Sequence, residues 1–463
     1  MFNKYLRDPF LIVMGLCMEI LKLPWILITG LVPLFFGIFM LIKAVASDLS
    51  VASTESCNPN VDPVDGEVLS NQRRKICELP PVVLVHGVFG FGEGKMGHVS
   101  YFGGAEKKYE RVFVPDLGSL TSIHDRARQF YYLKGGQVDY GEEHSKACGH
   151  SRFGRVYKQG KYPEWDEDRP IHFVGHSAGA QTVRVLHQML ADKAFRGYEN
   201  TSENWVLSLT AICGAFNGST RTYITGMKPE NWKSIKAISP LQLCRLSIIF
   251  SDWMDISWLK SYYTFGFDHF DMSWRKVGLK GLFNCLMGKA GPFGSGDWVL
   301  PDLTIQGSME INQKLKTFPN TFYFSYATKR TRKINSVTIP APIMEINPWF
   351  YIQISEMCRW RYPTNVPLPY EGYRDEDWQD NDGELNTISM THPHLPTEHP
   401  HCFVANDSEL LLQPQPGIWY YKIIEAVHVQ FVLNLDKAAV YDEVYDSIFE
   451  CCRKLSKNKS SSL

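Results

Sequence analysis

The sequence predicts an α/β fold with a mainly parallel central sheet, preceded by an N-terminal transmembrane segment. Short apolar, β-branched runs alternate with segments long enough for crossover helices, and this alternation is typical of a parallel sheet covered on both faces. A run from Pro24 to Ile42 contains no charged residue and approaches the roughly 20 residues that a spanning helix needs. The chain has 463 residues, of which 44% are hydrophobic, so it can bury a large core.

The overall charge balance excludes some classes of partner. The chain carries 48 basic and 49 acidic residues, a formal net charge of -1, so no global field favours nucleic acid. A small-molecule or lipid substrate fits this balance better. The 11 cysteines form no CxxC pair, which argues against a zinc ribbon and against a small disulfide scaffold.

The N-terminal region is predicted to be a membrane anchor, residues 1–48, with its span at about 24–42. Lys4, Arg7 and Lys22 precede the span, whereas Lys43 alone follows it closely. The positive-inside rule then predicts a single-pass protein with a cytosolic N-terminus and a lumenal catalytic domain, in the endoplasmic reticulum or secretory pathway. A removable signal peptide is the alternative, but its apolar region is normally shorter.

The globular part is predicted to follow a polar linker, residues 49–79, and to occupy residues 80–450. The final residues, 451–463, are polar and are expected to form a disordered tail. Apolar runs predict the core strands, and they lie at 81–85, 112–114, 171–174, 206–212 and 321–326.

A serine motif lies between the third of these strands and a predicted helix. The pentapeptide is Gly175-His176-Ser177-Ala178-Gly179, and apolar positions at helical spacing follow it. Serine needs a backbone geometry that exposes its hydroxyl, and flanking glycines permit the sharp strand-to-helix turn. The arrangement predicts that Ser177 is the nucleophile of an α/β-hydrolase fold. A structural Gly-Ser turn is the alternative.

An acyl-transfer site also needs N–H donors for the developing oxyanion. The expected donors are the residue after the nucleophile, Ala178, and a residue after the first core strand, Val88. A flexible glycine loop without a catalytic role is the alternative for the second position.

The general base and its acid partner should follow the serine, with the acid first. His428 is the best placed base, and Asp382 lies ahead of it in Asp380-Asn381-Asp382-Gly383. The aspartates of such a cluster are often solvated turn residues. The rival bases lie in one proline-rich loop and are His392, His394, His399 and His401.

Several segments together resemble a known family, the zinc-containing bacterial lipases of the staphylococcal and thermophilic Bacillus type. These segments include VVLVHG, DYGEEHSKACGHSRFGR, FVGHSAGAQTVR, YTFGFDHF, FPNTFYFSYATKRT and DNDGELNTISM, and the resemblance covers about Pro80 to His428. Membrane-anchored plant lipase-like proteins are similar as well. The resemblance implies a lipase, a serine hydrolase that acts on lipid acyl esters at a membrane surface. Its triad falls on Ser177, Asp382 and His428, with oxyanion donors Val88 and Ala178.

The resemblance also implies a structural zinc site in an insertion at about residues 116–165. Its ligands are expected to be Asp125, His144, His150 and Asp268, with Asp271 and Asp297 as weaker substitutes for the last. Two imidazoles and two carboxylates can close a four-coordinate shell. Cys148 lies between the two histidines and could compete for a thiophilic metal. The family's calcium site lacks its Asp-Pro pair here, so calcium binding is doubtful.

The resemblance also implies a helical lid, at about residues 217–265, and this region is rich in aromatic residues. Ordinary core packing is the alternative for any single aromatic residue. Two further readings of the function stay open. One is a lipid acyltransferase or phospholipase that uses the same triad, and the other is a non-catalytic membrane scaffold.

Overall fold

The computed structural model describes residues 79–405, 414–434 and 438–461. A seven-stranded sheet runs through it in the order β12-β13-β9-β6-β5-β1-β2, and every neighbouring pair of strands is parallel. The prediction of a mainly parallel central sheet is therefore confirmed. The strands are β1 (Val82–Val85), β2 (Val112–Phe113), β5 (Ile171–His176), β6 (Val206–Ile212), β9 (Phe322–Lys329), β12 (His401–Phe403) and β13 (Trp419–Glu425).

Successive residues of β1 belong to two different apolar cores. In β1, Val82 and Leu84 belong to one buried cluster, while Val83 and Val85 belong to the other. Successive side chains of a strand point to opposite faces of the sheet. Because both faces of β1 are buried, its sequence is a continuous apolar run.

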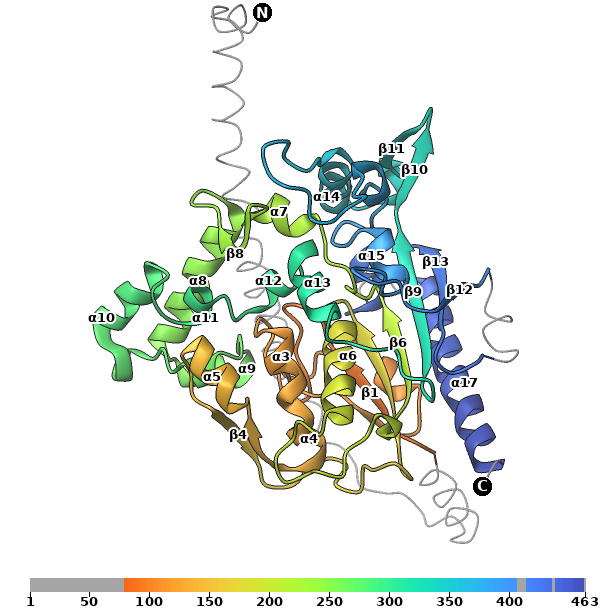
Figure 1. Cartoon of the computed structure of the whole chain (residues 1–463), viewed down its shortest axis with the longest axis horizontal. Coiled ribbons are helices and arrows are strands. Elements are labelled where there is room, and N and C mark those ends of the chain that lie inside the picture. Colours follow the sequence, from red (N-terminus) through yellow and green to blue (C-terminus); the bar gives the residue numbers. More distant parts are fainter. Residues whose placement is uncertain (1–78, 406–413, 435–437, 462–463) are drawn as a thin grey trace, which may run out of the picture.

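Helices cover both faces of the sheet (Figure 1). On one face lies α6 (Ala178–Ala191), which packs on β5, β6 and β1 and also against α3 (Ile123–Ala127). On the other face lies α17 (Ala439–Ser461), which is tied to β9 by a hydrogen bond between Tyr326 and Ser447. The prediction of a disordered tail at 451–463 is therefore wrong for residues 451–461, which belong to this helix. Cys451, Cys452 and Leu455 are buried, and this packing supports the helix despite its polar sequence.

The region expected to bind zinc lies between β2 and β5. Its elements are α3, η3 (Arg128–Phe130), α4 (Tyr131–Lys134), β3 (Gly136–Asp139), α5 (Glu142–Cys148) and β4 (Phe153–Tyr157), and β3 and β4 form an antiparallel pair. The extended loop around α5 reaches away from the sheet toward the later helices (Figure 1).

The segment after β6 is mostly helical and includes the expected lid. It contains α7 (Arg221–Thr225), β7 (Met227–Lys228), β8 (Asn231–Ile235), α8 (Pro240–Met254), α9 (Ser257–Tyr262), η5 (Asp268–Phe270), α10 (Trp274–Leu286), α11 (Pro292–Ser295), α12 (Val299–Asp302) and α13 (Ile305–Asn312). Between β9 and β13 lie β10 (Thr331–Ile334), β11 (Val337–Pro340), η6 (Ile343–Glu345), α14 (Pro348–Arg359), η7 (Asp375–Trp378) and α15 (Thr387–Thr391). Two short 3-10 turns, η2 (Ala105–Lys107) and η4 (Glu203–Trp205), and η8 (His428–Phe431) complete the set.

The prediction of a single-pass membrane protein with a lumenal catalytic domain is corrected by the structure. In the part of the chain that is described, no helix is both long and apolar enough to cross a membrane. The 23-residue α17, for example, carries Asp442, Glu443, Asp446 and Glu450. The predicted span at 24–42 and the anchor 1–48 lie outside the described residues.

Candidate active site and metal centre

Ser177 occupies a sharp turn between β5 and α6. Its backbone has φ 56° and ψ -125°, a conformation that side-chain-bearing residues rarely adopt. The Ser177 N–H donates to the carbonyl of Ile212 on the neighbouring strand at 3.0 Å, which fixes the turn to the sheet. Strain of this kind persists only where the surroundings impose it, and it is frequent at functional sites.

The glycines around Ser177 are required by close backbone approaches. A Cβ atom on Gly179 would lie 2.1 Å from the Val85 carbonyl oxygen, and one on Gly175 would lie 2.5 Å from the Cα atom of Ala180. Both contacts are too short for any side chain. The pentapeptide spacing therefore follows from how closely β1 and α6 pack against the turn.

A buried histidine and a buried aspartate meet beside this turn. His428 Nδ1 lies 2.9 Å from Asp382 Oδ2, although the two residues are far apart in the chain. Asp382 also accepts hydrogen bonds from the Thr328 hydroxyl at 2.6 Å and from the Leu385 N–H at 2.8 Å. These bonds fix the carboxylate and, through it, the imidazole ring.

Charge coupling within this pair shifts both pKa values. Burial by itself lowers the pKa of His428, but the negative charge of Asp382 outweighs burial and raises that pKa well above its ordinary value. Burial opposes ionisation of Asp382 as well. The charge of His428 and the hydrogen bonds to the carboxylate nevertheless hold the pKa of Asp382 below its usual value.

The His428 ring lies next to the serine turn. His176, the neighbour of Ser177, contacts the His428 carbonyl oxygen through Nε2 at 3.2 Å, and the two rings have centroids 4.9 Å apart. The rival histidines have other partners: His392 faces Glu398, and His399 bonds Thr317. The structure thus places the His428–Asp382 pair beside the residue that precedes Ser177 in the turn.

The two expected oxyanion donors flank the same turn. Ala178 is the first residue of α6, so its N–H is among those that have no partner within the helix. Val88 follows β1 directly after Gly87, and a Cβ atom on Gly87 would lie 2.8 Å from the Cβ atom of Ser177. The loop that carries Val88 therefore runs alongside the serine.

Two residues that the sequence did not single out hold this loop in place. The Tyr101 hydroxyl accepts a hydrogen bond from the Gly87 N–H at 3.1 Å and contacts His176 Nδ1 at 2.9 Å. Arg126 is fully buried and donates to the carbonyl oxygens of His86 and Gly118. No local motif marks either residue, because each acts on backbone groups that are distant in the sequence.

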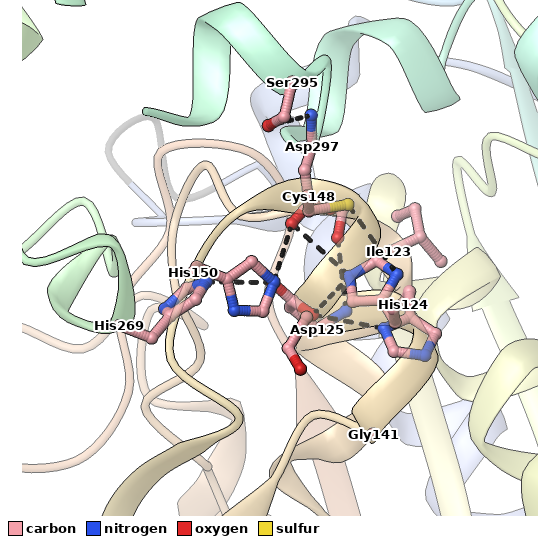
Figure 2. A network of polar contacts seen from close by, with 12 residues as sticks. Ile123, His124, Asp125, Gly141, Cys148, His150, His269, Ser295 and Asp297 are labelled. Carbon is pink, nitrogen blue, oxygen red and sulfur yellow. Dashed lines mark hydrogen bonds and ion pairs between the residues drawn. The ribbon is translucent and has the colours of Figure 1, made fainter. Parts of the chain in front are cut away.

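A second cluster of polar side chains lies in the insertion (Figure 2). His144 Nε2 is 3.1 Å from Asp125 Oδ1 and 3.4 Å from Asp297 Oδ2, and His150 Nε2 is 3.3 Å from the same Asp297 oxygen. His144 Nε2, His150 Nε2 and Asp297 Oδ2 are buried, and none has a hydrogen-bond partner among the described residues. Such a set of unsatisfied nitrogen and oxygen atoms fits a metal ion.

Three of the four expected metal ligands lie in this cluster, and the fourth does not. Asp268 is half exposed and faces Arg155 and Lys260, at 3.6 and 3.9 Å. Asp297, considered only as a weaker substitute, takes its place. The reason is the tight turn η5, where successive side chains point in different directions. His269 points inward, and its Nε2 lies 3.0 Å from Asp125 Oδ2.

Several neighbours orient the possible ligands. His269 and His124 both contact the Asp125 carboxylate, at 3.0 and 3.1 Å. Burial would raise the pKa of Asp125, but the contacts with His124, His144 and His269 hold it well below its usual range. Outer partners of this kind fix the direction of ligand atoms in metal sites.

The helical segment after β6 exposes many large apolar side chains. Trp258 on α9 is 62% exposed, and Leu279 and Phe283 on α10 are 74% and 58% exposed. Phe250, Met254, Trp274 and Met287 belong to the same group. The exposed apolar surface thus extends beyond the expected lid, 217–265, to residue 287.

Comparison with known proteins supports this picture of the fold. Residues 78–227 match the family described as "Lipase-like, C-terminal domain". The "Lipase" of Staphylococcus hyicus is 29% identical over 363 residues, which are 73% of this chain and 51% of that protein. The crystal structure of the Staphylococcus hyicus lipase has a TM-score of 0.66 and 26% identity, and the match covers 82% of this chain and 97% of that one. The chain is thus similar to a staphylococcal lipase in both sequence and fold.

A second solved structure has the same fold. EstA from Clostridium botulinum has a TM-score of 0.60 and 26% identity, and the match covers 88% of this chain and 93% of that one. The chain spans about half the length of the curated relatives it matches.

Proposed function

We propose that this protein is a carboxylic ester hydrolase, a lipase that cleaves acyl esters of lipids. The observation that carries the proposal is the strained Ser177 turn beside the buried His428–Asp382 pair. A serine hydroxyl becomes a nucleophile when a neighbouring base accepts its proton, and that base must be oriented by a third group. Similarity to proteins named as lipases supports the same reaction class.

The proposed reaction has two halves. Ser177 Oγ attacks the ester carbonyl carbon and passes its proton to His428 Nε2, while the N–H groups of Val88 and Ala178 stabilise the oxyanion. The imidazolium, stabilised by Asp382, then protonates the leaving alkoxide. Water hydrolyses the acyl-enzyme in the second half, with His428 again acting as base.

The exposed apolar side chains of α9 and α10 favour a water-insoluble substrate. Large apolar side chains exposed in one segment are costly in water and mark places where a protein meets apolar partners. A lipid phase would cover these side chains. A long-chain lipid ester is therefore the proposed substrate class.

The test is ester hydrolysis by the full chain, combined with covalent labelling. We expect turnover of p-nitrophenyl esters, faster with palmitate than with butyrate, and a fluorophosphonate adduct that peptide mass mapping assigns to Ser177. Product analysis with glycerol present distinguishes hydrolysis from acyl transfer, the alternative on the same triad. An intact protein that turns over no ester and takes no label at Ser177 would refute the proposal.

We also propose that the ion of the metal centre is zinc. In a tetrahedral zinc site the ligand atoms lie about 3.3 Å apart, because the bonds are about 2.0–2.1 Å long. Asp297 Oδ2 lies 3.4 Å from His144 Nε2 and 3.3 Å from His150 Nε2. Two imidazoles favour zinc over magnesium or calcium, which prefer oxygen ligands. Bound zinc would supply a structural cross-link between α5 and the segment that precedes α12.

Asp297 and Asp268 give a matched pair of variants for this site. Zinc at 100 times its Kd should stabilise the native protein by about 2.7 kcal/mol, and a chelator should reverse this. We expect a zinc-dependent rise in Tm for wild type and for Asp268→Asn, and none for Asp297→Asn. If Asp297→Asn keeps the zinc-dependent rise in Tm and Asp268→Asn loses it, Asp268 is the ligand instead of Asp297.

A further inference from the structure

Cys148 lies within the metal centre. It is the last residue of α5, one turn after His144, and only Gly149 separates it from His150. Its Sγ atom is 4.0 Å from His144 Nδ1. Figure 2 shows its sulfur beside Asp297, on the side of the cluster away from the loop of His269.

Cys148 completes a set of four possible ligands. One ligand atom each from His144, Cys148, His150 and Asp297 lies within 4.8 Å of the other three. Asp297 is 5% exposed, and its Oδ2 has no hydrogen-bond partner among the described residues. This set is complete without Asp125, whose two oxygens already contact His124, His144 and His269.

We propose that the Cys148 thiolate is a direct ligand of the metal ion, together with His144, His150 and Asp297. This inference rests on the metal centre proposed above, and it adds a sulfur ligand to it. Binding forms a metal–sulfur bond and breaks the S–H bond, and the proton leaves to solvent. No electron is transferred. Asp125 then stays outside this set of ligands, held by its contacts with His124 and His269.

A sulfur ligand changes which ions the centre prefers. Thiolate is soft and favours zinc, cobalt and cadmium over magnesium, calcium or manganese. The expected ligand set of two carboxylates and two imidazoles has no soft atom. The centre of this chain should therefore discriminate more strongly against hard cations.

Cobalt(II) is the probe, because a thiolate ligand gives a sulfur-to-cobalt charge-transfer band in the near ultraviolet. The full chain, reduced and freed of metal, is titrated with cobalt alone. We expect one cobalt per chain and this band in wild type. Cys148→Ser should lose the band, and its zinc affinity should fall at least about tenfold. Cys402→Ser, which changes an exposed cysteine, should keep the band.

Several results would overturn the assignment. One is a wild-type protein that holds one cobalt without the band, and another is an unchanged spectrum in Cys148→Ser. If wild type binds neither cobalt nor zinc, the metal centre itself fails, and the Cys148 assignment fails with it. X-ray absorption of zinc-loaded wild type needs no variant: we expect sulfur at about 2.3 Å, and a shell of nitrogen and oxygen alone refutes the assignment.

Discussion

Replacing Ser177 by alanine is expected to lower kcat for ester hydrolysis by about 10⁶-fold. The hydroxyl is the atom that bonds to the substrate, and the buried pair beside it has no other serine to activate at this turn. The measurement is kcat with p-nitrophenyl butyrate, together with the loss of fluorophosphonate labelling. Ser202→Ala is the matched control, because Ser202 lies at the edge of η4 and contacts Glu167.

The same experiment tests whether the three residues act as a unit. Adding His428→Ala to Ser177→Ala should lower kcat almost no further, because a base without its nucleophile has no role. An additive loss in the double variant would indicate two independent contributions. Retention of most activity in Ser177→Ala would remove Ser177 from the mechanism.

Asp382→Asn is expected to lower kcat by about 10⁴-fold. The carboxylate accepts a hydrogen bond from His428 Nδ1, which leaves Nε2 free to take the serine proton. An amide at this position can donate to Nδ1 and favour the opposite tautomer. Asp380→Asn is the matched control: Asp380 is two residues away, and its carboxylate bonds Lys329 and Thr331 instead.

The pH profile gives Asp382→Asn a second readout. The Asp382 charge raises the pKa of His428, so wild-type kcat/KM should rise with pH as the imidazole loses its proton. Removing the charge lowers that pKa, because the imidazolium loses its stabilising partner. The acidic limb of the residual activity should therefore move to lower pH. If the acidic limb keeps its position in Asp382→Asn, the charge of Asp382 does not raise the pKa of His428.

Features that depend on neighbouring residues could be predicted from the sequence. The run Val206 to Ile212 is predicted and observed with the same bounds, because an apolar β-branched run is a local signal. The turn at Ser177 is equally local, since its glycines lie within two residues of it.

Features that depend on contacts between distant residues could be predicted less well. Asp268 and Asp297 were both possible ligands, and the choice between them depends on how η5 turns its side chains. The polar C-terminal residues gave no sign of a helix, because Cys452 and Leu455 stabilise α17 through burial in a core that distant residues form. Tyr101 and Arg126 act on backbone groups, which leave no pattern in the sequence.

The Arg126 contacts have a consequence for how the protein responds to acid. Burial lowers the pKa of Arg126 to about 10, so its guanidinium stays charged at every pH below that value. Its bonds to the carbonyl oxygens of His86 and Gly118 therefore persist while His428 gains a proton. Lowering the pH through the raised pKa of His428 should then switch the protein off without disassembling it, and returning it to a pH above that pKa should restore turnover at once.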